Sequence, residues 1–437
     1  MSYFYLVLAV LSITVARFLN MRDPPPIMGV YTRPGKWYFL KFLIFFSMLH
    51  FRKFLNKMRS EKVEANQSGY GVKSRSSPDQ MDCSQPLSSD EKAIDAVYFN
   101  AASKDGQYMV VATARRPKGV INGFLYLQLP QVGLLMSPKL PDTTLQQTKE
   151  EEEAGVFGAE GLKLEPIEPM KRWKLTYNGK MRLSEAPEKE LSVVLNAEWK
   201  SNLPVFDFDT DMDPSPVARA LAKETWSREF FQILKEAHQS HYEQHGDIEG
   251  VVTIDGVKYP LNLNSMRDHS YGHKREWKNF HRYALHMGTL EDGTRFCASI
   301  VSCPINFSQI ELGYLYKPNG HVVPLQRCDL QLYQHGEDGT PPLDYAFNFW
   351  AGEFSFINFF YFYRFYSRFK EIRSIACRSK CCTRLSFTLQ TSGKRGLSSE
   401  WSPSGSTELR AGASLSGNIE IRWGRFSIEC LLWFLSK

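Results

Sequence analysis

The densest group of ionisable side chains lies in the segment 267–277, which reads RDHSYGHKREW. An aspartate beside a histidine can fix the imidazole tautomer and raise its basicity, so Arg267, Asp268 and His269 are candidate acid–base residues. Alternate side chains of a strand share a face, and we therefore expect Arg267 and His269 to point together, opposite Asp268 and Ser270. The alternative is an internal polar network that closes a barrel, with Arg267 paired to a buried carboxylate.

Further polar and aromatic side chains surround this triplet and predict a ligand site at the mouth of a barrel. A barrel interior is the natural enclosed apolar volume of a β-protein, so the ligand we expect is hydrophobic. The candidate ligand-binding residues are Ser270, Tyr271, His273, Arg275, Trp277 and His281.

Two other groups of metal-ligand side chains are regularly spaced but predict no metal site. His238, His241 and His245 would share one face of a helix, yet no fourth ligand accompanies them. Four aspartates alternate within 207–213, but the Gly and Glu positions of a calcium-binding EF-hand loop hold other residue types. No phosphate loop, nucleophile elbow or kinase signature is present, so we predict neither a metal ion nor a cofactor.

Hairpin signals punctuate the middle of the chain. Asn-Gly and Asp-Gly favour two-residue hairpins because both central residues need a positive φ. These pairs are Asn178-Gly179, Asp255-Gly256, Asp292-Gly293, Asn319-Gly320 and Asp338-Gly339. Alternating or apolar segments around them predict strands at 107–114, 124–129, 172–177, 191–199, 250–254, 282–287, 295–302 and 309–316. This spacing is typical of antiparallel sandwiches and barrels.

One long helix is predicted between the strand-rich blocks. Asp213-Pro214-Ser215-Pro216 can cap it, and no Gly or Pro follows until Gly246. We therefore expect a mainly β protein, with a first β domain at 93–212, an amphipathic connecting helix at 213–246 and a second β domain at 247–352.

The amino-terminal region has two apolar stretches, 1–16 and 37–51, each followed by basic residues. A cleaved signal peptide would need a basic segment before the apolar one, so a signal anchor, a hairpin or an interfacial helix pair fits better. We predict a membrane anchor at 1–55 and a linker at 56–92. The positive-inside rule places the body on the cytoplasmic side of an endomembrane, although N-x-S sequons at Asn66 and Asn306 point the other way.

The last part of the chain differs in charge and pattern. Residues 353–437 hold 13 basic and 6 acidic side chains, which leaves 40 basic and 41 acidic in the rest of the chain. The main body therefore lacks the basic face that nucleic acid binding requires. We expect this tail to be poorly packed, either as an aromatic membrane-associated segment or as an alternative terminal exon. The eight cysteines form no C-x-x-C pair and predict free thiols.

The stretch SMRDHSYG at 265–272 carries a resemblance to double-lipocalin families, which include carotenoid hydratases and Diels–Alderase-type cyclases. With GKMRL at 179–183 and QHGEDG at 334–339, residues 90–350 also resemble the amino-terminal region of animal phosphoenolpyruvate synthase-like proteins. The resemblance implies two β-barrels facing an apolar ligand, with Arg267, Asp268 and His269 near it or at the barrel interface. No ATP-grasp or phosphohistidine region is present, so phosphotransfer is not implied for this chain.

Two classes of function follow from these features. One is a membrane-attached binding module for a hydrophobic small molecule or lipid. The other is an acid–base enzyme that hydrates, isomerises or cyclises such a molecule. A third possibility is an accessory region related to a phosphoenolpyruvate synthase-like phosphotransferase. The expected partners are membrane lipids and a hydrophobic small molecule.

Overall fold

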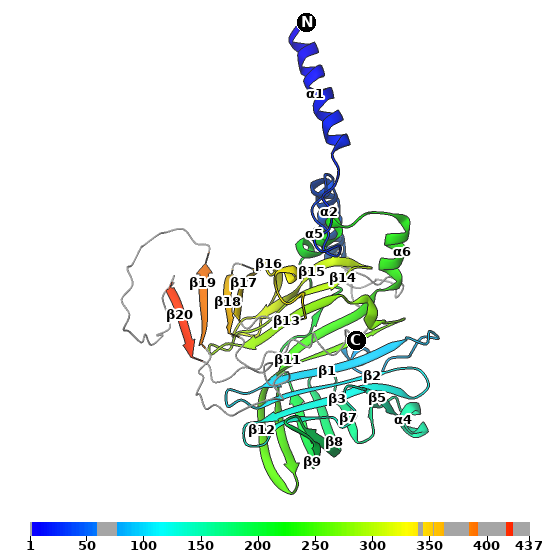
Figure 1. Cartoon of the computed structure of the whole chain (residues 1–437), viewed down its shortest axis with the longest axis vertical. Helices are drawn as coiled ribbons and strands as arrows, with labels where there is room; N and C mark the ends of the chain where they lie inside the picture. Colours follow the sequence, from blue (N-terminus) through cyan, green and yellow to red (C-terminus); the bar gives the residue numbers. More distant parts are fainter. Residues whose placement is uncertain are drawn as a thin grey trace.

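The computed structural model describes residues 2–58, 77–339, 344–352, 354–361, 384–391 and 417–422. Two antiparallel sheets form the body, and an apolar helix precedes them (Figure 1). The predicted fold class is therefore confirmed: the protein is mainly β, with two antiparallel halves.

The first sheet holds twelve strands. Their bounds are β1 (Ile94–Ala102), β2 (Tyr108–Arg115), β3 (Val120–Leu129), β4 (Gly133–Met136), β5 (Thr144–Gln146), β6 (Phe157–Ala159), β7 (Leu162–Glu168), β8 (Arg172–Leu183), β9 (Ala186–Lys200), β10 (Phe206–Asp207), β11 (Gln239–Ile254) and β12 (Val257–Gly272). A short helix, α4 (Lys149–Glu153), precedes β6.

Strand pairing closes this sheet into a barrel. Strand β9 pairs with both β8 and β11, so the ring β11-β12-β1-β2-β3-β4-β8-β9 returns to its start. Side chains alternate along β9, where every second residue from Leu191 to Trp199 is buried. Trp173, Trp199 and Phe99 fill the interior, and all three are fully buried. The first barrel is therefore a packed core.

The second sheet holds eight strands in chain order. Their bounds are β13 (Arg282–Thr289), β14 (Arg295–Cys303), β15 (Phe307–Tyr316), β16 (Val322–Cys328), β17 (Asp344–Ala351), β18 (Phe354–Tyr361), β19 (Arg384–Thr391) and β20 (Gly417–Arg422). Short 3-10 turns lie at Trp277–Asn279 and Leu332–Gln334. Strands β18 to β20 come from the predicted tail at 353–437 and continue this sheet; the rest of that tail lies outside the described residues.

Most of the predicted hairpins form. Asp255 and Gly256 have φ of 46° and 87° and join β11 to β12, as the two-residue turn requires. Asp292-Gly293 joins β13 to β14, and Asn319-Gly320 joins β15 to β16. The hairpin predicted at Asn178-Gly179 is wrong, because both residues lie inside β8 and pair with β9.

The single helix predicted at 213–246 is also wrong. The segment forms α5 (Pro214–Lys223), α6 (Arg228–Glu236) and the first half of β11. Asp213 caps α5, and Ser227 caps a separate α6, so the chain breaks between them. Pairing of β11 with β12 along its whole length outweighs the helix propensity of 239–245.

The same pairing moves a domain boundary. Strands β11 and β12 complete the first barrel, although we expected residues 247–272 in the second β domain. The second sheet begins at Arg282. The two helices therefore do not connect the halves along the chain, but α5 packs on β15 and β16 of the second sheet.

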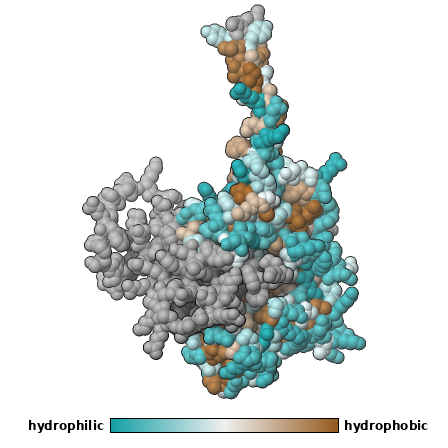
Figure 2. All heavy atoms as spheres, viewed as in Figure 1, coloured by the Kyte–Doolittle hydropathy of each residue, from teal (hydrophilic) through white to brown (hydrophobic). Residues whose placement is uncertain are grey.

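The amino-terminal region contains α1 (Ser2–Asn20), α2 (Tyr38–Met58) and α3 (Pro78–Met81). Of the helices in the described residues, α1 alone is long and apolar enough to cross a membrane by length and composition. It projects from the body (Figure 1), and apolar surface gathers along it (Figure 2). In contrast, α2 packs on α5 through the buried Leu49.

The linker predicted at 56–92 is wrong for residues 56–58, which end α2, and for residues 77–92. Residues 59–76 lie outside the described residues, but 77–92 pack on the barrel. Asp82 and Met81, both in this segment, are buried.

The packed barrel predicts a large cost for truncating a core side chain. Leu263 on β12 is fully buried, so Leu263→Ala should lower the free energy of unfolding by about 2–5 kcal/mol through lost burial and a cavity. The control Val257→Ala, at a residue of the same strand that is 55% exposed, should change it by less than about 0.5 kcal/mol. Denaturant unfolding of the full chain in mild detergent measures both; equal effects would contradict a packed interior.

Candidate functional site

Strand β12 divides the predicted site residues between two environments. Arg267 and His269 point into the barrel and are 1% and 0% exposed. Asp268 lies on the opposite face and is only partly buried. The predicted alternation is therefore confirmed, but it separates His269 from Asp268, which the structure places in different groups.

Arg267 forms a buried ion pair with Asp82. Its two terminal nitrogens lie 2.7 and 3.1 Å from the two carboxylate oxygens. The same carboxylate accepts hydrogen bonds from the Met170 amide (2.6 Å), the Trp173 indole (3.0 Å) and the Tyr242 hydroxyl (2.9 Å). Burial opposes ionisation of Asp82, yet the charge of Arg267 and these hydrogen bonds outweigh it and lower the Asp82 pKa.

His269 is held in the same interior. Its Nε2 lies 2.6 Å from Asp95 Oδ1, and its Nδ1 lies 2.7 Å from the Tyr242 hydroxyl. Asp95 also accepts hydrogen bonds from Arg115 (2.7 Å) and from the amide of Gln85 (2.8 Å). Both ring nitrogens of His269 thus have partners, and its side chain is fully buried. Asp82, Asp95, Tyr242, Arg267 and His269 together are named here the barrel-core network.

This network matches the alternative in which Arg267 pairs with a buried carboxylate inside the barrel. Asp82, Asp95, Arg267 and His269 carry acidic or basic groups that would be costly to bury alone, so the members depend on one another. The network ties the segment before β1 to β12 across the barrel, which is a structural task.

A second polar group lies on the other face of the same strands. Asp268 is the cross-strand partner of Glu243, and Ser270 is the partner of His241. His241 Nε2 lies 3.2 Å from Glu243 Oε1, and His241 Nδ1 lies 3.0 Å from Ser270 Oγ. The Ser270 hydroxyl lies 3.4 Å from Asp268 Oδ1. These four side chains form a continuous chain of hydrogen-bonding groups.

The second sheet contributes Cys297 and Tyr314, which face Glu243. Burial first, and then the charge of Glu243, raise the pKa values of Cys297 and Tyr314 well above their ordinary range. The Tyr314 hydroxyl and Glu243 Oε2 are buried, and Tyr314 and Cys297 both interact with the Glu243 side chain. His241, Glu243, Asp268, Ser270, Cys297 and Tyr314 together are named here the sheet-interface cluster.

The sheet-interface cluster has unusual proton affinities. Burial, reinforced by the charge of Glu243, raises the pKa of Asp268 to about 6. Burial opposes protonation of His241, but the hydrogen bond and charge of Glu243 and the charge of Asp268 raise its pKa. A carboxyl group and a hydrogen-bonded imidazole whose pKa values are both raised by their surroundings are candidates for acid–base chemistry.

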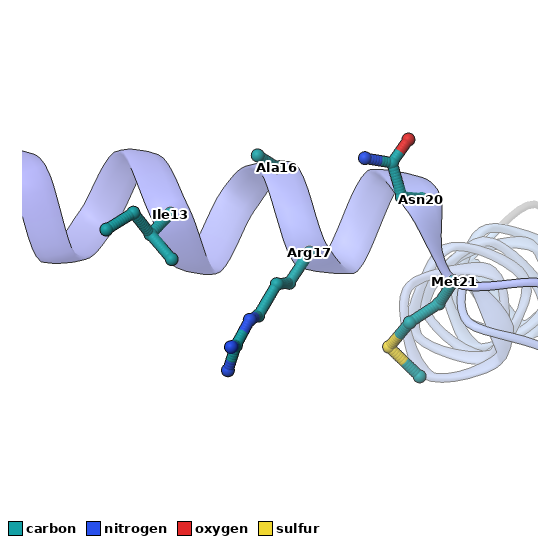
Figure 3. Close-up of a pocket in the computed structure, with 5 residues that line it drawn as sticks. All are labelled: Ile13, Ala16, Arg17, Asn20 and Met21. Atoms are coloured by element: carbon teal, nitrogen blue, oxygen red, sulfur yellow. The ribbon is translucent and has the colours of Figure 1, made fainter.

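The side chains of the sheet-interface cluster differ in their exposure to solvent. The His241 side chain is 30% exposed, whereas that of Glu243 is 6% exposed. A proton can therefore move between solvent and the buried carboxylate through His241. Two hollows formed by described residues lie elsewhere, one along the end of α1 (Figure 3) and one beside His335 on the second sheet.

The remaining predicted ligand residues do not form one group. Arg275 lies near Asp268 and donates a hydrogen bond to Gln239 (2.6 Å); burial lowers its pKa to about 10. The other members are dispersed: Tyr271 packs on His269, His273 is exposed near Asp90, Trp277 lies under Arg275, and His281 lies 3.2 Å from Glu337.

The histidines considered for a metal do not share a helix face. His238 lies 2.7 Å from Asp209, His241 belongs to the sheet-interface cluster, and burial lowers the pKa of His245 to about 3. In the part of the chain that the structure describes, no group of three or more His, Cys, Asp or Glu side chains could hold a metal ion.

Sequence reasoning missed three important residues. Asp82 lies in a segment that reads as a linker, and its partner is 185 positions away. Glu243 and Tyr314 lie in segments with no motif, and only the pairing of β11 with β12 and the packing of the second sheet bring them together. The one available signal was the alternation of His241, Glu243 and His245, which a strand places on one face.

Comparison with known proteins identifies the family. A family model matches residues 4–362. The chain belongs to the family of unknown function DUF8627. No curated protein matches the sequence.

Three solved structures are similar to this chain at 10% identity. An AttH-like protein of Nitrosomonas europaea has a TM-score of 0.40 and covers 70% of this chain and 90% of its own. Kievitone hydratase from Nectria haematococca has a TM-score of 0.38, with 69% and 85% covered. CghA has a TM-score of 0.35, with 71% and 90% covered.

Similarity at this level transfers no residue role or activity to the chain. The resemblance to phosphoenolpyruvate synthase-like proteins stays a prediction.

The barrel-core network predicts a large effect of breaking its ion pair. Arg267→Met should cost about 3–5 kcal/mol of unfolding free energy, because it leaves Asp82 buried without a counter-charge. Lys171→Met is the control, since the Lys171–Glu168 pair is exposed and should contribute about 0–1 kcal/mol. Because its folded pKa is lowered, Asp82 should stabilise the wild type above the ordinary carboxyl range, and this contribution should disappear as the pH falls. Denaturant unfolding at several pH values checks both; a cost of under about 1 kcal/mol for Arg267→Met would contradict the buried pair.

We expect the contribution of Asp268 to folding stability to have the opposite pH dependence. Its folded pKa is raised from 3.8 to about 6, so ionisation of Asp268 destabilises the fold progressively as the pH rises through that window. Asp268→Asn should therefore become more stable than wild type as the pH rises from 4 to 8. The difference in melting temperature measures this. A variant that is less stable at every pH would show Asp268 to be a structural residue.

Proposed function

We propose that this protein takes up a small apolar molecule or lipid between its two sheets and that the sheet-interface cluster transfers protons on it. The observation that carries the proposal is the pair Asp268 and Glu243 with His241 beside them. Burial raises the Asp268 pKa to about 6, while its cross-strand partner Glu243 is buried and lies 3.2 Å from His241. Pairs of titratable groups whose environments shift their pKa values mark acid–base sites.

The chemistry divides between the two carboxyl groups. Protonated Asp268 can give a proton to a double bond or carbonyl of the ligand, and Glu243 Oε2 can accept one from the ligand or from a bound water. His241, which lies 3.2 Å from Glu243 and is partly exposed, can return that proton to solvent. Hydration, isomerisation and cyclisation each need such a donor and acceptor. We propose this reaction class and no particular product.

Apolar surroundings of the cluster support an apolar ligand. Tyr314 and Cys297 belong to a hydrophobic cluster that also holds Phe206, Phe208 and, on α2, Leu49. This hydrophobic cluster therefore extends from the neighbourhood of Asp268 and Glu243 to helix α2. A mostly apolar lining with a few convergent polar groups is the usual composition of a small-molecule site.

A membrane location completes the proposal. We propose that the body faces the cytoplasmic side of an endomembrane, and the proposal is supported by Arg17 and Arg22, which follow the apolar part of α1, through the positive-inside rule. Membrane lipids would then be both the surroundings of the protein and the source of its ligand. A protein that only binds such a molecule, without chemistry, is the second candidate, and the same apolar cluster supports it.

Deuterium labelling tests the proposal. The full chain is incubated in nanodiscs with total lipid extract in heavy water, and the apolar small molecules are analysed by mass spectrometry. We expect one compound that gains deuterium or changes mass with wild type. Asp268→Asn should abolish the change, because an amide cannot give the proton, whereas Glu249→Gln on the neighbouring strand β11, an exposed carboxylate paired with Lys200, should not. Labelling should also fall as the pH rises through about 6, since Asp268 loses its proton there.

Each other outcome contradicts a stated part of the proposal. A compound that co-purifies unlabelled with both wild type and Asp268→Asn would leave the binding function and overturn the catalytic one. Labelling that persists in Asp268→Asn would move the chemistry away from the sheet-interface cluster. A full chain that neither retains nor labels any apolar molecule would overturn both functions.

A further inference from the structure

Helix α2 has two apolar faces, and the body covers only one. Leu49 is buried, and Phe42, Phe45 and Phe46 pack on the hydrophobic cluster of α5 and β15. The opposite face carries six exposed apolar side chains: Phe39, Leu40, Leu43, Ile44, Phe51 and Phe54. Phe39, Phe51 and Phe54 are 68%, 60% and 57% exposed. These six residues are named here the outer face of α2.

The outer face is a continuous surface. Helical spacing at 100° per residue places all six side chains within one half of the helix, opposite the side that holds Leu49. A contiguous exposed patch of large aromatic and aliphatic side chains marks an interaction site. We therefore expect another molecule or a membrane to cover the outer face of α2.

The position of α2 relative to α1 is fixed by contacts. The Lys36 ammonium donates to the carbonyl of Leu19 (2.6 Å), and its amide donates to Asp23 (2.7 Å). The rings of Phe18 and Trp37 meet edge to face at 4.9 Å. Figure 3 shows α1 running across the picture while the axis of α2, just beyond Met21, points into it. If α1 crosses a bilayer, the axis of α2 runs along the bilayer surface more than across the bilayer.

The loop between the two helices is also held by the body. The Tyr31 hydroxyl donates to Glu337, and the Thr32 hydroxyl is hydrogen-bonded to Ser308 and Glu224. Tyr31 is 3% exposed and belongs to the core of the second sheet. The outer face of α2 therefore has one orientation relative to both the body and α1.

Charge around the outer face identifies the occupant. Residues 1–58 contain eight basic side chains and one acidic side chain. Arg17, Arg22 and Arg33 are exposed at the junction of the two helices. Basic residues beside an apolar helix face bind anionic headgroups at a bilayer surface. A second copy of this chain would bring two sets of like charges together, which opposes self-association through this face.

We propose that the outer face of α2 lies in the boundary between headgroups and acyl chains of an anionic phospholipid leaflet. It is a second membrane attachment, distinct from the span of α1. The attachment fixes the rotation of the body about α1 and does not depend on any catalytic role of the sheet-interface cluster.

Photo-crosslinking in vesicles tests this attachment. The full chain, with benzoylphenylalanine in place of Leu43, is reconstituted into vesicles of phosphatidylcholine with or without phosphatidylserine and irradiated. We expect a protein–phospholipid adduct at Leu43, with more adduct when phosphatidylserine is present. The exposed control position Val257, at the start of β12, should give none, and the body-facing control Phe46 should crosslink within the chain.

Charge substitutions and product masses decide between occupants. Arg22→Gln with Arg33→Gln should remove the effect of phosphatidylserine while leaving the melting temperature unchanged, since both side chains are exposed. An adduct of twice the chain mass at Leu43 would overturn the proposal in favour of a second copy. Absence of any adduct at Leu43, in a protein that α1 still holds in the vesicles, would show that the outer face of α2 stays in water.

Discussion

The buried ion pair between Arg267 and Asp82 sets the position of β12, on which the rest of the site depends. Arg267 can enter the barrel only with a fully hydrogen-bonded carboxylate, and Asp82 supplies it from outside the sheet. With Arg267 and His269 fixed inside, Asp268 must face the second sheet. A slip of one residue would exchange the two faces and bury Asp268 in the barrel without a cation, so the ion pair also fixes the sheet-interface cluster.

The two carboxyl groups on the two sides of β12 thus end in opposite electrostatic states. Asp82, paired with Arg267, stays charged with a lowered pKa, while Asp268 has no cation as close and its pKa is raised to about 6. The difference lies in the partners, because burial alone opposes ionisation of both carboxyl groups. A stable interior and a site that titrates near neutrality are therefore compatible within one hairpin of β11 and β12.

Short sequence patterns correctly predicted the features that depend only on neighbouring residues, such as turns and the alternation of side chains along a strand. Asp255-Gly256 forms the expected turn, and the alternation of Arg267 and Asp268 follows from the pleat of a strand. Long-range pairing decided the rest. The segment 239–245 has a helical pattern, yet it pairs with β12, and Asp82 is identified only by a residue 185 positions away. A single sequence contains no signal for such pairings, so neither the barrel-core network nor the role of Glu243 could be predicted from it.

The apolar cluster around α5 joins the two surfaces that matter most. Leu49 of α2 and Tyr314 of β15 belong to the same cluster, so the helix that carries the exposed outer face also packs toward the carboxyl pair. A displacement of α2 would change the packing around Tyr314, because densely packed interiors transmit small shifts. A leaflet that holds the outer face of α2 would therefore also order the apolar side of the sheet-interface cluster. The position of the protein on the membrane and the geometry of its site are then coupled.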